Sequence, residues 1–141
     1  MAKESKGSCL CGKVAITVTL NNTGLHACHC NTCRKWGGGP LFGYFHEGLI
    51  ALKGKEYVST YNSSDWAERS FCKHCGSHLL YKIKGQDIYS ISAWILDDVE
   101  NIHFDSQVFI DKKPAYYSLA DKTEEYTEEQ VLAMYASESQ K

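Results

Sequence analysis

The seven cysteines of this chain fall into three short clusters, and their spacing limits the fold more than any other feature. The clusters are Cys9–Cys11, Cys28–Cys33 and Cys72–Cys75. An odd number of thiols leaves one over in a disulfide framework, and the amino terminus lacks the apolar stretch of a secretory signal. We therefore expect a cytoplasmic protein whose cysteines stay reduced, and the clusters favour metal binding over disulfides.

Four of the cysteines have the spacing of a structural zinc site. Cys72-x-x-Cys75 followed by Gly76 is typical of a zinc knuckle, in which a tight turn aims two sulfurs at one point. Cys9 and Cys11 can supply the other two ligands from a position just before the first expected strand. The alternative, two unrelated reactive thiol pairs, leaves the glycine-bounded turn unexplained. The sequence thus predicts one structural zinc ion bound by Cys9, Cys11, Cys72 and Cys75.

The other three cysteines predict a second and different zinc site. Cys28, Cys30 and Cys33 are close enough for one loop to wrap a single ion and leave a fourth position open. Such a site can deprotonate an incoming thiol. The alternatives are a site closed by a histidine or a weak site that loses its metal, and the candidate fourth ligands are His26, His29 and His46. A thioredoxin-like redox pair is not favoured, because we expect neither a βαβ unit nor a helix start at these cysteines.

The length and composition indicate a single domain, residues 1–141. The chain is 43% hydrophobic, which allows a substantial core, but no apolar run is long enough to cross a membrane. Its formal charge of −2, with both signs mixed along the sequence, argues against a nucleic-acid partner. Small molecules or proteins are the better candidate partners.

Apolar and β-branched residues that alternate at period two predict a mainly β fold, a sandwich or curled sheets. Trp94 continues one such pattern and is expected in the core. A capping box at 127–130, Thr127 followed by Gln130, predicts a short helix at the carboxyl end. The expected strands are Val14–Leu20, Leu41–Phe45, Tyr57–Tyr61, His78–Ile83, Ile88–Ala93 and Gln107–Ile110.

Three ordered blocks resemble the signature of the glutathione-dependent formaldehyde-activating enzyme family, also known from centromere protein V. The blocks are Gly7–Val14, Cys28–Lys35 and Phe71–Leu79, and Phe109–Pro114 is similar to a late strand and turn of the family. The resemblance implies an Mss4-like β fold with zinc-binding loops and two zinc ions per chain. It also implies that the four-cysteine zinc is structural and that the three-cysteine zinc is catalytic, which agrees with the division made from spacing.

The resemblance further implies a carbon–sulfur lyase, similar to an S-(hydroxymethyl)glutathione synthase, whose partners are a small thiol such as glutathione and an aldehyde. Arg34 and Lys35 follow the last ligand and could attract a substrate carboxylate, although a solvated basic pair is the commoner arrangement. The alternative function is a noncatalytic, zinc-stabilised binding module in which both sites are structural.

Overall fold

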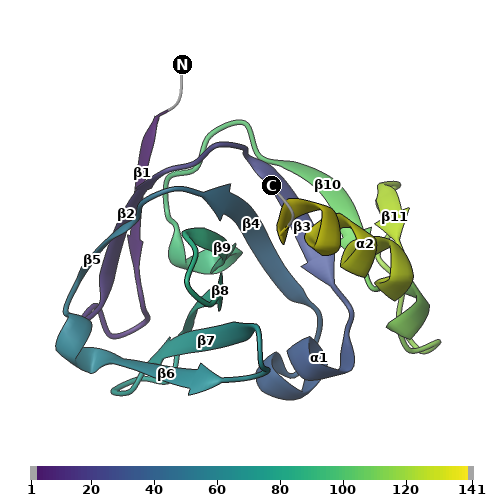
Figure 1. Cartoon of the computed structure of the whole chain (residues 1–141). Helices are drawn as coiled ribbons and strands as arrows, with labels where there is room; N and C mark the ends of the chain where they lie inside the picture. Colours follow the sequence, from purple (N-terminus) through teal and green to yellow (C-terminus); the bar gives the residue numbers. More distant parts are fainter. Residues whose placement is uncertain (1–2, 140–141) are drawn as a thin grey trace. The chain divides into compact units, whose positions relative to one another are not determined.

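Strands dominate the structure, a computed structural model that describes residues 3–139 (Figure 1). The chain divides into two units. The first comprises the residues up to Gly24 together with Gly43–His103, and the second comprises Leu25–Phe42 together with the chain from Phe104 onward. The prediction of a mainly β fold with a short carboxyl-terminal helix is confirmed. Within the described residues no helix is long and apolar enough to span a membrane.

The first unit contains a small antiparallel sheet with the strand order β1-β2-β5. Its strands are β1 (Glu4–Ser8), β2 (Ala15–Thr19) and β5 (Ala51–Lys53). The alternation in β2 buries Ile16 and Val18 on one face and leaves Thr17 and Thr19 less buried, as a period of two requires. This sheet places the first cysteine pair, because Cys9 and Cys11 follow β1 directly.

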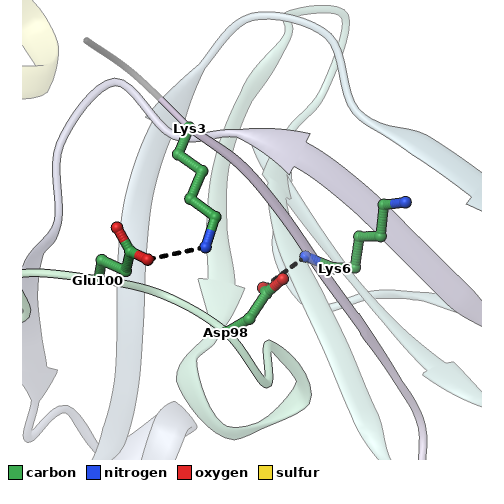
Figure 2. A network of polar contacts seen from close by, with 4 residues as sticks. All are labelled: Lys3, Lys6, Asp98 and Glu100. Atoms are coloured by element: carbon green, nitrogen blue, oxygen red, sulfur yellow. Dashed lines mark hydrogen bonds and ion pairs between the residues drawn. The ribbon is translucent and has the colours of Figure 1, made fainter.

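The outer side of β1 is held by the chain segment that follows β9 (Figure 2). The Lys6 backbone N–H donates a hydrogen bond of 2.8 Å to the Asp98 carboxylate, and the Lys3 ammonium pairs with Glu100 at 2.9 Å. A backbone bridge between Gly7 and Leu96 continues this pairing. The edge of β1 is thereby covered rather than left open to another chain.

An antiparallel ladder completes the first unit, in the order β4-β9-β8-β7-β6. Its core includes Leu79 and Ile91, which are almost completely buried. The strands are β4 (Leu41–Glu47), β6 (Val58–Asn62), β7 (Ala67–Cys72), β8 (His78–Ile83) and β9 (Ile88–Ser92).

As far as residue 139, the second unit combines three strands, two α-helices and a 3₁₀ turn. β3 (Gly24–Cys28), β10 (His103–Val108) and β11 (Glu124–Tyr126) lie in the order β11-β10-β3, and β10 and β11 are parallel. The helix α1 (Asn31–Gly37) follows β3 after a short turn, and α2 (Glu128–Ser139) packs beside β11 (Figure 1). β3 leads directly into the three-cysteine cluster, so the second unit holds that cluster.

Several local predictions differ from the structure. The expected strand Gln107–Ile110 is wrong after Val108, because Phe109 adopts a left-handed backbone conformation and Ile110–Lys112 form a 3₁₀ turn. Trp94 was expected in the core but is 77% exposed. β9 ends at Ser92, and a 3₁₀ turn over Ala93–Ile95 rotates the side chains out of the strand alternation.

The predicted capping box at the start of α2 is confirmed. The Thr127 backbone N–H donates to Gln130 Oε1 at 2.8 Å, and the Gln130 backbone N–H donates to Thr127 Oγ1 at 3.3 Å. These two bonds satisfy amide groups that the first turn of a helix leaves unpaired. Val131, in the first turn, is buried and anchors the helix.

We expect Thr127→Ala to weaken α2 by about 1 kcal/mol, since the substitution removes the acceptor for the Gln130 amide. Hydrogen exchange at the first amides of α2 should accelerate about fivefold. Thr127→Ser is the matched control because it keeps the hydroxyl and should exchange at the wild-type rate. Equal acceleration in both variants would contradict a capping role for the hydroxyl.

Candidate metal centres

The structure brings the four predicted structural ligands together within the first unit. The sulfurs of Cys9, Cys11, Cys72 and Cys75 all lie within 4.8 Å of one another. Cys9 and Cys11 are joined by an S···S distance of 3.6 Å, and Cys11 and Cys72 by 3.8 Å. Cys9 and Cys72 are buried and Cys11 is exposed, so the cluster lies at the rim of the core. Four sulfurs at this spacing can surround one thiophilic cation.

The turn of the knuckle has the geometry that its sequence predicts. Gly76 has a φ of +80°, a conformation that glycine adopts without strain, and its N–H donates to the Cys72 carbonyl oxygen at 2.7 Å. The Cys72 N–H in turn donates to the Ser77 carbonyl oxygen at 2.9 Å. This turn reverses the chain between β7 and β8, so that both knuckle sulfurs face the Cys9–Cys11 loop.

Ser77 is a supporting residue of this cluster. Its hydroxyl oxygen accepts the Leu10 backbone N–H at 3.0 Å, which leaves the O–H free to donate to Cys75 Sγ at 3.2 Å. Bonds from the Ser77 hydroxyl and backbone lower the pKa of Cys75 to about 5. Because a metal ligand must be a thiolate, Ser77 stabilises Cys75 in its binding form and also ties the two cysteine loops together.

We expect Ser77→Ala to raise the dissociation constant for the metal of the four-cysteine site about tenfold or more, because it removes the bonds to Cys75 and Leu10. Competition with a chromophoric chelator measures this constant. Ser8→Ala is the control: the Ser8 hydroxyl donates to the Cys9 carbonyl oxygen rather than to a sulfur. If Ser77→Ala released the metal no more easily than Ser8→Ala, the supporting role of Ser77 would be refuted.

The three remaining cysteines also converge, within the second unit. The sulfurs of Cys28, Cys30 and Cys33 lie within 4.8 Å of one another. Cys28 ends β3, Cys30 is the N-cap of α1, and Cys33 lies in the first turn of that helix. The Cys33 backbone N–H donates to Cys30 Sγ at 3.3 Å. The expectation that a loop alone carries these ligands is therefore wrong, as is the expectation that no helix begins at this cysteine pair.

A bound cation would offset the electrostatic repulsion that arises when these three cysteines are thiolates. Contacts with Cys30 and Cys33, followed by burial, raise the pKa of the Cys28 thiol well above its ordinary value. Three thiolates at this spacing repel one another, and a divalent cation between them reverses the sign of that interaction. The donor set therefore fits a thiophilic metal ion, and Cys30, which is less buried than Cys28 and Cys33, marks the more accessible side.

His29 lies between two of these cysteines but does not act as their fourth ligand. Its ring is completely buried, with Nδ1 2.8 Å from the Tyr117 hydroxyl and Nε2 2.8 Å from Gln107 Oε1. Burial lowers the pKa of His29, and the positive charges of Lys113 and Arg34 lower it further. Both ring nitrogens are already engaged by uncharged partners, so neither is available to a metal ion.

The other histidines proposed as fourth ligands also remain outside the cluster. Among residues 3–134, whose side chains the structure describes, no histidine or carboxylate joins the group of three sulfurs. His26 lies on β3, and burial lowers its pKa to about 4. His46 is buried on β4, where its Nε2 lies 3.3 Å from the Leu49 carbonyl oxygen. Within the described chain the two cysteine sets thus differ in their number of ligands.

Arg34 has a structural role that the sequence did not indicate. Its Nε donates to the His29 carbonyl oxygen at 3.0 Å, and its Nη2 donates to the Lys112 carbonyl oxygen at 3.4 Å. These bonds tie α1 to the 3₁₀ turn that carries Lys112. Lys35, the next residue, is exposed. Of the two basic residues expected to be solvated, Arg34 therefore has a structural role and Lys35 is exposed to solvent.

Sequence reasoning missed the polar residues that surround His29, namely Gln107 and Tyr117. They are 78 and 88 residues away from His29 along the chain. The turn that carries Tyr117 is fixed by Lys113, whose ammonium donates to the Tyr117 carbonyl oxygen and, at 3.3 Å, to the Ser118 hydroxyl. The sequence signals near them, an expected strand from Gln107 and a turn at Pro114, do not indicate a site.

Comparisons with known proteins agree on the family. A family model described as glutathione-dependent formaldehyde-activating enzyme matches residues 4–112. An uncharacterized lyase of Schizosaccharomyces pombe is 38% identical over 130 residues, which are 92% of this chain and 95% of the relative. A crystal structure of a Rhodobacter sphaeroides protein superposes with a TM-score of 0.58 at 26% identity, over 68% of this chain and 91% of the other.

The family match includes all seven cysteines, since Cys9 and Cys75 both lie between residues 4 and 112. The curated relative extends the similarity over almost the whole chain. The resemblance that the three cysteine blocks suggested is confirmed. The chain belongs to the glutathione-dependent formaldehyde-activating enzyme family.

Proposed function

We propose that the protein is a zinc-dependent carbon–sulfur lyase that reversibly joins a small thiol, glutathione or a similar compound, to an aldehyde such as formaldehyde. In this proposal Cys28, Cys30 and Cys33 hold the catalytic zinc ion. A second, structural zinc ion is held by Cys9, Cys11, Cys72 and Cys75. The family match and the relative named as a lyase support a lyase activity.

One observation carries the proposal: among the side chains described, those of residues 3–134, three sulfurs converge without a fourth cysteine, histidine or carboxylate ligand. His29, the nearest candidate in sequence, is engaged through both ring nitrogens by Tyr117 and Gln107. A structural zinc site has four protein ligands, whereas a catalytic site keeps one position for water or substrate. Zinc bound by three thiolates supplies a site that lowers the pKa of an incoming thiol, so that the thiol reacts as a thiolate near neutral pH.

The chain's own residues favour an anionic thiol at this place. α1 presents the exposed Lys35 one turn after Cys30, and Arg34 links that helix to Lys112, which is also exposed. Lys113 contributes a further positive charge close enough to lower the pKa of His29. A tripeptide thiol that carries carboxylates, as glutathione does, is attracted by this group of cations.

Native mass spectrometry and exchange NMR test the proposed function together. We expect two zinc ions per chain, a zinc-dependent complex with glutathione, and enzyme-accelerated exchange of ¹³C-formaldehyde with its glutathione adduct. S-methylglutathione is the matched ligand control, since it keeps the carboxylates but has no thiol to ionise. Cys30→Ser should abolish both the complex and the exchange.

The alternative function predicts a different pattern in the same experiment. A binding module with two closed sites holds two zinc ions but forms no glutathione complex and leaves the exchange rate unchanged. That result would reject the lyase proposal. Binding of S-methylglutathione as tightly as glutathione would reject the role assigned to the thiol, because such binding would depend on the carboxylates alone.

A further inference from the structure

Three hydrogen bonds link the side chains of Thr123, Gln107, His29 and Tyr117 in that order. The Thr123 hydroxyl determines which group donates in each of them. Thr123 Oγ1 donates its hydrogen to the Glu124 carbonyl oxygen at 3.0 Å. Toward Gln107 the same oxygen can therefore only accept, and it lies 3.3 Å from Gln107 Nε2. A side-chain amide donates through its nitrogen and accepts through its oxygen. Thr123 thus fixes the orientation of the buried Gln107 amide, with Oε1 directed at His29.

The orientation of Gln107 sets the tautomer of His29. Because Gln107 Oε1 can only accept, His29 Nε2 must carry the hydrogen of their 2.8 Å bond. The ring is completely buried between two uncharged partners, which favours the neutral imidazole, and the other nitrogen is then an acceptor. His29 Nδ1 therefore accepts the hydrogen of the Tyr117 hydroxyl, 2.8 Å away. All four side chains have a single consistent set of donors and acceptors.

This polarity leaves the Tyr117 oxygen with lone pairs for a further donor. Its hydrogen is committed to His29, so the hydroxyl can accept a hydrogen bond from a ligand but cannot donate one. Tyr117 is only partly buried, and its ring lies beside that of His29, the residue between Cys28 and Cys30, with ring centroids 5.6 Å apart. Its ring also contacts Tyr116, with centroids 5.6 Å apart, and lies under the Lys113 ammonium at 5.3 Å. The hydroxyl is thus held in place against His29, whose backbone lies between two of the three clustered cysteines.

We propose that Tyr117 accepts the hydrogen bond of the hydroxyl group on the thiol–aldehyde adduct, and that Thr123, Gln107 and His29 are positioning residues for this contact. The inference rests on the proposed function, in which the adduct carries the group S–C–OH. Neither a free thiol nor a thioether offers such a hydroxyl. Tyr117 therefore distinguishes the adduct from the thiol alone.

The hydrogen bond between Tyr117 and the adduct hydroxyl would assist cleavage of the adduct into thiolate and aldehyde. The carbon–sulfur bond breaks and its electron pair goes to sulfur, while the O–H bond breaks, a carbon–oxygen double bond forms and the proton passes to water. The products are one thiolate, one aldehyde and one proton. An acceptor on the hydroxyl hydrogen increases the electron density on oxygen as that double bond forms, and the bond that Tyr117 donates to His29 strengthens it as an acceptor.

Tyr117→Phe tests the proposal, and Tyr116→Phe is the matched control because no hydrogen bond joins the Tyr116 hydroxyl to His29. The zinc-loaded full chain is assayed with glutathione and ¹³C-formaldehyde by exchange NMR, and with glutathione alone by calorimetry. We expect Tyr117→Phe to lower kcat/KM for adduct cleavage about tenfold. Glutathione affinity and the zinc content should stay within twofold of wild type. Tyr116→Phe should match wild type in every measurement.

The tautomer of His29 can be measured independently of activity and reports on the positioning residues. Long-range ¹H–¹⁵N NMR of the imidazole should show His29 protonated at Nε2 in wild type and in Tyr117→Phe. Gln107→Leu removes the acceptor for Nε2, so His29 should shift toward protonation at Nδ1. That shift reverses the polarity of the Tyr117 bond and should lower kcat/KM about as much as Tyr117→Phe does.

Three results would overturn the inference, and they differ from one another. Turnover by Tyr117→Phe at the wild-type rate would leave the lyase function standing and remove Tyr117 from it. Loss of zinc from Tyr117→Phe would make Tyr117 a structural residue. Absence of turnover by wild type would reject the proposed function, and the contact to the adduct with it.

Discussion

Cys72→Ser and Cys75→Ser are expected to unfold the protein. Cys72 is fully buried at the end of β7, and its cluster joins that strand to the Cys9–Cys11 loop 61 residues earlier. Binding of a structural zinc ion contributes about 10–16 kcal/mol in small zinc domains, which matches or exceeds the usual net stability of about 5–15 kcal/mol. Loss of one ligand should therefore cost most of the free energy of unfolding.

The matched controls are Cys28→Ser and Cys33→Ser, which make the same chemical change at buried cysteines of the other cluster. They should lose one metal ion per chain and remain folded, because the three-cysteine cluster spans only six residues that β3 and α1 already hold. Circular dichroism during thermal unfolding and metal analysis of the same samples separate the two classes. Equal loss of structure in both classes would refute the division into a structural and an open site.

The cysteine groups could be predicted from the sequence because spacing carries most of their information. Two sulfurs in a knuckle such as Cys72–Cys75 are brought together by local backbone geometry. The pairing of that knuckle with Cys9 and Cys11 is long-range, but the other three cysteines already form a cluster of their own within six residues. The alternating β2 and the capping box at Thr127 were likewise predicted correctly, since their signals lie within a few residues.

The elements and contacts that were missed have no clear local signal in the sequence. α1 begins at Asn31 and is capped by Cys30, whose side chain accepts the Cys33 amide, a role more often filled by Ser, Thr, Asp or Asn. The short strand β3 has no clear alternation, because Leu25, Ala27 and Cys28 are all buried. Tyr117 reaches His29 only through a turn fixed by Lys113. No local pattern indicates such a contact.

Gly7→Ala is expected to destabilise the protein by about 4 kcal/mol or more, which is exceptional for so small a change. A Cβ atom at Gly7 would lie 1.6 Å from the Ile95 carbonyl oxygen and 2.7 Å from Leu96 Cα. These are backbone atoms, so no side-chain rotation relieves the clash. Gly7 also pairs with Ile16 in β2 and with Leu96 on its other side, so β1 cannot move away without breaking one of the two pairings.

Gly85→Ala is the control for the intrinsic effect of replacing glycine. Gly85 has a φ of +76° and no atom within 4 Å of the added Cβ, so the substitution should cost only about 1–2 kcal/mol of backbone strain. Urea unfolding of both variants measures the difference, with the slope m as a check that the transition remains two-state. Gly7 does not have a positive φ, so backbone strain alone would predict a smaller loss of stability in Gly7→Ala than in Gly85→Ala. A smaller loss in Gly7→Ala than in Gly85→Ala would therefore show that β1 is not held as tightly against the Ile95–Leu96 backbone as the structure has it.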